Sequence, residues 1–457
     1  MTIADRFQVR QRGSSLRAEV IGGVTTFVTM AYIIVVNPAI LSFAGIPTGP
    51  STVATIVTAV FGTALMGLYA NRPIAVAPYM GENAFIAFGL AALGIGWQQR
   101  LGAVFISGVV FLAITLLGVR RWLAESISRS LKHSFAAGIG LFLTLIGLYE
   151  CGLVTSFVTG MPAAALDGGG GLLRAPDVPL KIGDLRSPEV LLALFGLVVM
   201  IGLYLRKVTG AVILGIAVTA VAGVLLGHGS APAGLFALPF TGEYSLAPIA
   251  LKLDVAGVLR PALFPVLLTL VLMGFLDTLG SLVGVGAAGG MLDERGDLPQ
   301  IERPMTVDAL ACVVSGLLGT STSGAYIESA TGIREGARTG LAALVTAGLF
   351  ALSLFFLPLV APLQQMRYAY APALVLVGVI MFGTVRRIDF DDATELVPSF
   401  LTLATMVFTY NIANGLTVGL VAAPLCKVFA GRAREVTAGG ATLGAACLAY
   451  YLFGLPH

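Results

Sequence analysis

The sequence predicts an all-α polytopic membrane protein with about fourteen transmembrane segments, arranged as a 7+7 inverted repeat. Three observations lead to this prediction. Of the 457 residues, 57% are hydrophobic and only 11% are charged, whereas a soluble domain has roughly 25% charged residues. Apolar runs of spanning length follow one another along the chain. Two glycine-interrupted polar segments occupy matching places in its two halves.

The apolar runs form two sets of seven, separated by a longer connection. The first set lies at about 18–41, 52–70, 74–94, 100–119, 131–149, 188–205 and 209–227. The second lies at about 261–290, 304–319, 324–335, 338–359, 370–385, 396–412 and 415–430. Because seven is an odd number, the second half enters the membrane with the opposite orientation. A last run at about 436–454 is open between a spanning and a non-spanning helix, and we favour the non-spanning one.

The two halves share one plan. Each opens with a long helix that carries polar residues, Thr26 in the first half and Asp277 in the second. Two elements later each half has a broken polar segment, APYMGENAFIAFG at 77–89 and TSGAYIESATG at 322–332. Paired broken segments in corresponding positions indicate the binding site of a transporter. The alternative is a chance match among the 57 glycines of the chain.

Basic residues predict how the chain is oriented. With the N-terminus inside, 20 of the 27 Lys and Arg residues fall on the inner side. The positive-inside rule therefore predicts a cytoplasmic N-terminal segment, 1–17. Two long loops, at about 150–187 and 228–260, then lie outside. A net charge of +3 gives no indication of a nucleic-acid partner.

The acids within apolar elements are the first candidate site residues. Glu328 lies between glycines, where a half-helix offers free N–H groups, and Asp277 lies far from any other charge in its own run. Carboxylates at this depth indicate function, and a buried acid paired for structure alone is the alternative. Asp308 begins the next element and is either functional or interfacial.

The third segment contributes an adjacent acid and amide. Asn83 can donate and accept at once, which suits a heterocyclic ring, and an Asn bonded to a neighbouring helix is the alternative. Glu82 is less certain, since adjacent residues face different ways. Phe85 and Tyr326 are possible contacts for a flat ring.

The sequence lacks the residues that several classes of function require. The four cysteines have no metal spacing, and no embedded His, HExxH or Gly-x-Ser-x-Gly supports an intramembrane enzyme. No Walker-type loop is present, so we expect no ATP-driven pump, no cofactor and no metal. A channel lacks its expected motif too, although sequence alone excludes it poorly.

Five segments closely resemble the AzgA-like purine permeases, a branch of the nucleobase–ascorbate (nucleobase–cation symport) transporters. They are TTFVTMAYIIVVNPAIL, MGENAFIAF, FLDTLGSLVGV, GTSTSGAYIESATGIREGARTG and VPSFLTLATMVFTYNIANGLTVGLV. The resemblance implies proton-coupled uptake of adenine, guanine or hypoxanthine across the cytoplasmic membrane, by a protein surrounded by lipid and commonly a homodimer. It also implies an elevator-like movement of a core domain against a gate domain. On that division the core is 18–119 and 261–359, the gate is 120–227 and 360–430, an extracytoplasmic loop is 228–260, and a C-terminal apolar segment is 431–457.

The resemblance also assigns residues. Asn83 matches the substrate-contacting residue of the third helix, Asp277 the essential acid of the eighth, Glu328 the binding residue of the tenth, and Asp308 an acid of the ninth that matters in the wider superfamily. The expected proton-coupling residues are Asp277, Glu328 and Asp308. The expected substrate-binding residues are Thr26, Glu82, Asn83, Ala84, Phe85, Asp277, Tyr326, Ile327 and Glu328.

The sequence departs from the wider superfamily at two positions, and other kinds of transporter are alternative interpretations. Ser329 and Ser281 stand where some relatives in the wider superfamily have an amide and an ionisable group, so the family's proton route cannot be copied wholesale. The nearest alternatives are an anion transporter for sulfate or bicarbonate, and a transporter of another nucleobase such as uracil or xanthine, on the same fold. An anion site favours half-helix N-termini and a basic group, whereas the midplane charges here are acids.

Overall fold

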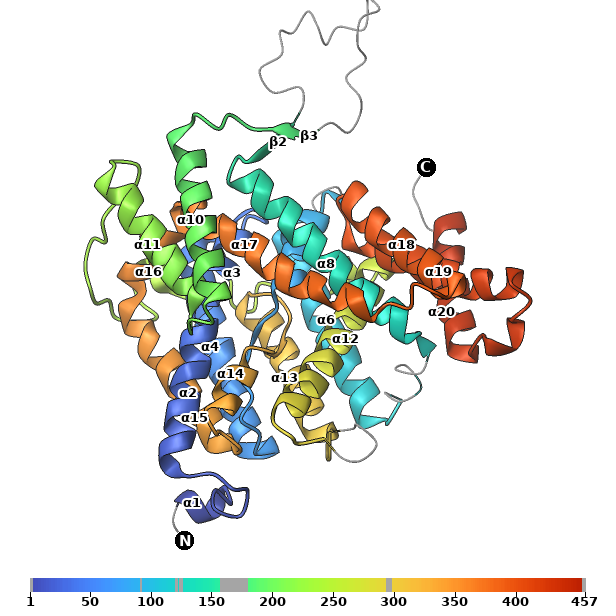
Figure 1. Cartoon of the computed structure of the whole chain (residues 1–457), viewed down its shortest axis with the longest axis horizontal. Coiled ribbons are helices and arrows are strands. Elements are labelled where there is room, and N and C mark those ends of the chain that lie inside the picture. The colour runs from blue at the N-terminus through green and yellow to red at the C-terminus, as the bar shows by residue number, and fades with distance from the viewer. Residues whose placement is uncertain are drawn as a thin grey trace, which may run out of the picture.

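The computed structural model describes residues 3–90, 93–119, 122, 126–156, 180–292 and 298–453. Most of the predicted outer loop at 150–187 therefore lies outside the described residues. The described chain is mostly helical, with long helices crossing one another and the strands β2 and β3 at one edge (Figure 1).

The first half contains the following elements: α1 (Ile3–Arg6), α2 (Leu16–Met30), α3 (Ile33–Ser42), α4 (Thr48–Leu65), a π-helical turn (Met66–Ala70), β1 (Val76–Pro78), α5 (Met80–Ala84), a second π-helical turn (Phe85–Gly89), α6 (Trp97–Leu116), α8 (Arg129–Glu150), α10 (Pro188–Leu205) and α11 (Ala211–Leu225). Strands β2 (Val154–Ser156) and β3 (Leu180–Ile182) pair antiparallel after α8.

The second half repeats this order: α12 (Phe264–Ala288), α13 (Glu302–Leu318), β4 (Ser323–Ala325), α14 (Ser329–Arg334), α15 (Gly340–Ser353), α16 (Leu357–Gln365), α17 (Arg367–Phe382), α18 (Ala393–Phe408) and α19 (Ile412–Phe429). A further helix, α20 (Ala438–Phe453), follows and packs against α19. Its apolar stretch, Ala438–Ala449, is shorter than the helices that can cross a membrane. The prediction of a C-terminal helix is confirmed, and its non-spanning placement stays a prediction.

The fourteen predicted segments are all present. Nine helices of the described chain are long and apolar enough to cross a membrane. The shorter helices α11, α13 and α18 supply three more segments, and the broken third and tenth segments complete two sets of seven. The protein is therefore a multi-pass membrane protein with the predicted 7+7 plan.

The first segment has an interruption that the sequence did not predict. Helix α2 ends at Met30 and α3 begins at Ile33, with a turn between them. Within α3, Pro38 cannot bond the carbonyl of Ile34, and the amide of Gln364 donates to that oxygen at 3.0 Å instead. A polar side chain from the second repeat thus satisfies the backbone group that a proline leaves free.

The third and tenth segments are broken as predicted, but each begins with a strand rather than a helix. Strands β1 and β4 pair antiparallel, with Val76 opposite Ala325 and Pro78 opposite Ser323. Both strands are fully buried. Extended backbone inside a membrane must find partners within the protein, and these two segments bond to each other.

An arginine caps the short helix of each broken segment. Arg100, largely buried, donates from one Nη to the carbonyls of Ile86 (2.6 Å) and Ala87 (2.9 Å). Arg338 donates in the same way to the carbonyls of Ile333 (2.6 Å) and Ala337 (2.8 Å). Carbonyls at the end of a short helix lack intrahelical partners and attract a positive charge. The two half-helices are therefore closed in the same manner.

The helices of the described chain pack in groups, and the division into core and gate stays a prediction. Helices α2, α4, α14 and α15 pack together, as do α6, α12 and α13, whereas α8 packs against α17 and α18. At the α2–α14 contact a Cβ on Gly332 would lie 2.2 Å from the carbonyl oxygen of Gly22. Glycine is required there because the two backbones almost touch. The exact domain boundaries stay a prediction.

Candidate functional site

Strands β1 and β4 lie at the centre of the candidate site, and a polar side chain from the preceding helix forms hydrogen bonds with each strand. The Thr63 hydroxyl, on α4, pairs with both the amide (2.9 Å) and the carbonyl (3.0 Å) of Val76. Asp308, on α13, accepts from the amide of Ala325 at 2.8 Å. Since Val76 and Ala325 are opposite one another in the strand pair, Thr63 and Asp308 bond to the same end of that pair, one from each repeat.

Asp308 is fully buried, and its functional role stays a prediction. Its Oδ2 also accepts a 2.9 Å bond from the hydroxyl of Thr278 on α12. Its Oδ1 is buried and has no hydrogen-bond partner among the described residues. Asp308 therefore fixes strand β4 and helix α12, and one carboxylate oxygen is still free to bond.

Glu82 and Asp277 bring two acids together from different repeats. Glu82, on α5, is fully buried, and neither carboxylate oxygen has a hydrogen-bond partner in the described part of the chain. Asp277, on α12, is half-buried. The two carboxyl groups are close enough to interact electrostatically. Two negative charges close together in a site of low polarity raise its free energy. This favours a proton shared between the carboxyl groups of Glu82 and Asp277, or a ligand bound to them.

Glu328 lies at the start of α14 and is half-buried. The hydroxyl of Tyr32, in the interruption of the first segment, donates to its Oε1 at 2.9 Å. The neighbouring side chain of Ile327 is 51% exposed, so this edge of the tenth segment is open. The sequence analysis proposed Glu328 and did not identify Tyr32.

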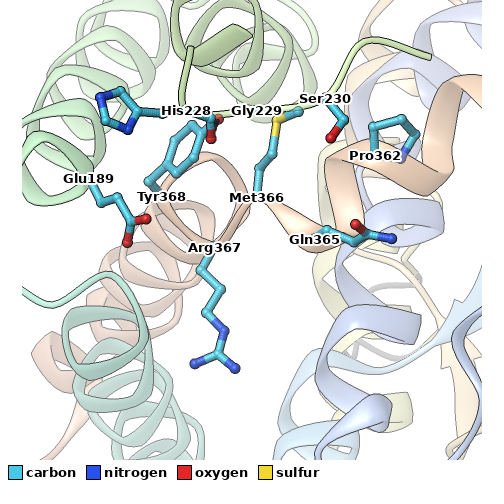
Figure 2. A pocket seen from close by; sticks show the side chains of 9 residues that line it. All are labelled: Glu189, His228, Gly229, Ser230, Pro362, Gln365, Met366, Arg367 and Tyr368. Atoms are coloured by element: carbon cyan, nitrogen blue, oxygen red, sulfur yellow. Dashed lines mark hydrogen bonds between the residues drawn. The ribbon is translucent and has the colours of Figure 1, made fainter. Parts of the chain in front are cut away.

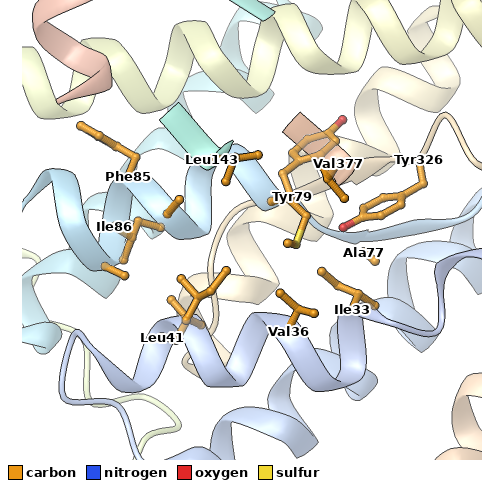
Figure 3. Close-up of a cluster of buried hydrophobic side chains, with 14 of the residues drawn as sticks. Ile33, Val36, Leu41, Ala77, Tyr79, Phe85, Ile86, Leu143, Tyr326 and Val377 are labelled. Atoms are coloured by element: carbon orange, nitrogen blue, oxygen red, sulfur yellow. The ribbon is translucent and has the colours of Figure 1, made fainter. Parts of the chain in front are cut away.

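Two tyrosine rings, those of Tyr79 and Tyr326, lie near one another in the buried cluster (Figure 3). The rings of Tyr79 and Tyr326 are nearly parallel, with centroids 6.1 Å apart and an interplanar angle of 7°. The Tyr79 hydroxyl bonds to Thr278 at 3.2 Å, and the Tyr326 hydroxyl donates to the carbonyl of Pro78. The Tyr326 phenol also interacts electrostatically with three of the acids, Glu82, Asp277 and Glu328.

Asn83 faces away from Glu82, as adjacent residues were expected to do. It is fully buried, and its amide nitrogen donates to Oδ1 of Asn37 at 2.9 Å. The amide nitrogen of Asn37 in turn donates to Thr55 (2.8 Å) and Thr320 (2.9 Å). This geometry favours the alternative that Asn83 bonds to a neighbouring helix. Its Oδ1 has no partner among the described residues, so a role in binding stays a prediction.

The other predicted contacts are spread around this centre. Ala84 and Phe85 are completely buried, and Phe85 lies within the hydrophobic core (Figure 3). Thr26 is also buried, and its hydroxyl lies close to Gly332 at the α2–α14 contact. The described structure thus brings the four acids, Tyr326 and Ile327 together. Phe85 and Thr26 are instead buried in the surrounding core.

The sequence analysis missed four residues that hold the acids or Asn83, namely Tyr32, Asn37, Tyr79 and Thr278. Each is a side chain able to form hydrogen bonds in an apolar run, which was the only signal available. The partners of Tyr32 and Asn37, Glu328 and Asn83, are 296 and 46 residues away along the chain. The packing of the helices brings these positions together.

A cavity of about 440 Å³ lies elsewhere, between the start of α10, the end of α11 and the α16–α17 junction (Figure 2). Its lining includes Glu189, His228, Gln365, Arg367 and Tyr368. None of the four acids of the candidate site lines it. The cavity is therefore separate from the candidate site.

A row of aromatic contacts joins the predicted core to the predicted gate. The Arg367 guanidinium lies 5.0 Å from the ring centroid of Phe43, whose ring packs on Phe88 at 5.1 Å. Phe88 contacts Tyr410 at 6.3 Å, and Tyr410 contacts Phe142 at 5.3 Å. Phe43 and Phe88 belong to the predicted core, whereas Phe142, Arg367 and Tyr410 belong to the predicted gate.

The fold is one already known among solved membrane proteins. It is similar to the solved transmembrane domain of a cyanobacterial bicarbonate transporter, BicA, with a TM-score of 0.58 and 18% sequence identity, covering 88% of this chain and 97% of that one. At this identity the likeness concerns the fold alone. With its broken third and tenth segments, the chain is a permease of the 7+7 inverted-repeat type and not an enzyme.

Sequence comparison gives the family. Residues 17–418 match the model of the Permease family. The adenine permease AdeP of Escherichia coli (strain K12) is 36% identical over 436 residues, covering 94% of this chain and 92% of AdeP. The guanine/hypoxanthine permease PbuO of Bacillus subtilis (strain 168) is 35% identical over 434 residues, covering 94% of this chain and 96% of PbuO. The chain belongs to this permease family, within the nucleobase–ascorbate transporter superfamily, and the predicted resemblance is confirmed.

Proposed function

We propose that this permease takes up purine nucleobases, namely adenine, guanine or hypoxanthine, together with protons. The observation that carries the proposal is the cluster of four acids around the strand pair, of which Glu82 and Asp308 are fully buried and Asp277 and Glu328 are half-buried. Among the described residues none of these acids forms an ion pair with a basic side chain. The names of AdeP and PbuO support a purine as the substrate.

The chemistry of a purine suits such a site. A purine base is neutral and flat, and its edge carries N–H donors beside ring-nitrogen or carbonyl acceptors. Carboxylates accept from N–H groups, and Glu328 and Asp277 are the proposed partners of the base. A ligand without matching donors leaves these acids unpaired, which gives the site its selectivity.

Proton coupling follows from the same acids. A carboxyl group in the membrane interior can carry a proton across as a neutral group and release it on the other side. Each proton that moves inward gains about 2.3 kcal/mol per 100 mV of membrane potential. Glu82 and Asp277 are close enough that a proton on one affects the other, so this pair is the proposed coupling element.

An elevator-like movement would carry the site across the membrane. The strand pair and all four acids belong to the predicted core, which would move as one unit against the gate. The aromatic contacts Phe88–Tyr410 and Phe142–Tyr410 lie across that boundary and would have to change. A homodimer of gate domains surrounded by lipid is the assembly we propose.

Uptake into proteoliposomes tests the proposal. Labelled adenine, guanine, hypoxanthine, uracil and sulfate would be supplied with and without an inward proton gradient. We expect saturable uptake of at least one purine, lost on addition of a protonophore, and no sulfate uptake. Uptake driven only by sodium would contradict the coupling, and the absence of purine uptake would contradict the substrate.

A further inference from the structure

We infer that Tyr32 is a positioning residue that fixes the acceptor oxygens of Glu328 for the bound base, an inference that rests on the proposed function. The observation is the 2.9 Å hydrogen bond from the Tyr32 hydroxyl to Oε1 of Glu328. Tyr32 is 2% exposed, while Glu328 is half-buried at the open edge of the tenth segment. A buried donor thus reaches the inner side of a carboxylate whose other side is accessible.

Two packed segments set the position of this bond. Tyr32 lies in the interruption between α2 and α3, and Glu328 lies immediately before α14. Next to them α2 and α14 are in backbone contact at Gly22 and Gly332, and the Thr29 and Thr331 hydroxyls are 3.2 Å apart. Because both backbones are fixed there, the phenol of Tyr32 and the carboxylate of Glu328 are held close together and need few rotamers to form their hydrogen bond.

The chemistry of the Tyr32–Glu328 pair determines which group of a ligand can hydrogen-bond to it. A phenol has one O–H, and an ionised carboxylate can only accept. The charge-assisted bond from Tyr32 occupies Oε1 and orients the carboxylate plane. Oε2 has no side-chain partner among the described residues and is left to accept an N–H of the base. The pair therefore selects a ring that presents a donor, not a bare acceptor, toward the tenth segment.

The other two tyrosines around the acids have different partners. The Tyr79 hydroxyl bonds to Thr278, and the Tyr326 hydroxyl donates to the carbonyl of Pro78. Of these three tyrosines in the described structure, Tyr32 is the one whose hydroxyl meets a carboxylate. The role of orienting Glu328 thus falls to Tyr32.

Transport kinetics of Tyr32→Phe test the inference. Because a hydrogen bond to a charged group is lost, we expect KM for the preferred purine to rise about 10- to 100-fold while Vmax stays within about twofold. The matched control is Tyr370→Phe, since Tyr370 is also 2% exposed and does not contact the acids through any described hydrogen bond. We expect the control to keep the wild-type KM.

A double mutant separates positioning from a structural role. In a Glu328→Ala background, which leaves the Tyr32 hydroxyl no acceptor at this position, Tyr32→Phe should change KM by less than about twofold. Wild-type KM in Tyr32→Phe, or penalties that simply add in the double mutant, would overturn the inference. If Tyr32→Phe does not fold, Tyr32→His, which keeps a donor, is compared with Tyr32→Leu, and equal KM values would overturn it. Absence of purine uptake by the wild type would contradict the proposed function instead.

Discussion

The carboxylate of Asp308 accepts a hydrogen bond from the backbone amide of Ala325, at 2.8 Å in the fully buried centre of the protein. In the other repeat the hydroxyl of Thr63 bonds to Val76, the residue opposite Ala325. One repeat thus holds its strand with an alcohol and the other with an acid. The acid has a free oxygen as well, so the same bond that builds the site leaves a group able to carry a proton.

Asp308→Ala should destabilise the protein, because the amide of Ala325 and the hydroxyl of Thr278 both lose their acceptor. A buried donor left without a partner costs roughly 1–3 kcal/mol. We expect a lower melting temperature in detergent, whereas Asp308→Asn keeps an acceptor oxygen and should stay close to the wild type. Thr63→Val is the matched control on the other strand and should lower the melting temperature without changing coupling. A wild-type melting temperature for Asp308→Ala would show that the bond contributes little.

Asp277→Asn and Glu328→Gln should separate coupling from recognition. Asp277 adjoins the partnerless Glu82, so we assign it the proton, and a neutral amide there should permit purine exchange but abolish accumulation against a gradient. Glu328→Gln presents donors where a carboxylate presented acceptors, and should change affinity or the preferred purine. Counterflow and net uptake would be compared for both, with surface expression checked. Accumulation by Asp277→Asn together with loss of coupling alone in Glu328→Gln would reverse the assignment.

Asn83→Ala should weaken purine binding more than it slows turnover if the free Oδ1 of Asn83 reaches the ligand, at a cost of roughly 1–3 kcal/mol. Asn37→Ala is the comparison, since Asn37 bonds to Asn83, Thr55 and Thr320 and should affect stability first. Equilibrium purine binding and melting temperature are measured for both. Wild-type binding by Asn83→Ala would assign Asn83 to the structural network.

Gly332→Ala should destabilise the core, because a methyl group there would lie 2.2 Å from the carbonyl oxygen of Gly22 and 2.3 Å from the Thr26 hydroxyl. Forcing apart packed segments costs typically about 1–3 kcal/mol. Gly348→Ala, on α15, is the control, since a methyl group there meets nothing within 4 Å. The melting temperature in detergent should fall for the first variant and be unchanged or higher for the second. Equal values would mean that α2 and α14 separate without cost.

The fold could be predicted from the sequence because the composition of each segment shows whether that segment can span a membrane. Apolar runs, an odd number of elements per half and two glycine-interrupted segments were sufficient for the 7+7 plan. Asp277, Glu328 and Glu82 stood out for the same reason, as charges in apolar surroundings. The strand pair could not be predicted, because Val76 and Ala325 are joined across the whole chain and neither run has strand-like alternation. Tyr32 and Asn37 bond to Glu328 and Asn83, which are distant along the chain, so their roles appear only in three dimensions.

Proton movement evoked by a purine tests the central claim most directly. Proteoliposomes holding a pH-sensitive dye would receive the preferred purine on the outside, with no gradient imposed at the start. We predict acidification of the lumen that saturates with purine, is absent in Asp277→Asn and is abolished by a protonophore. Purine uptake of normal rate without any change in lumenal pH would contradict the account.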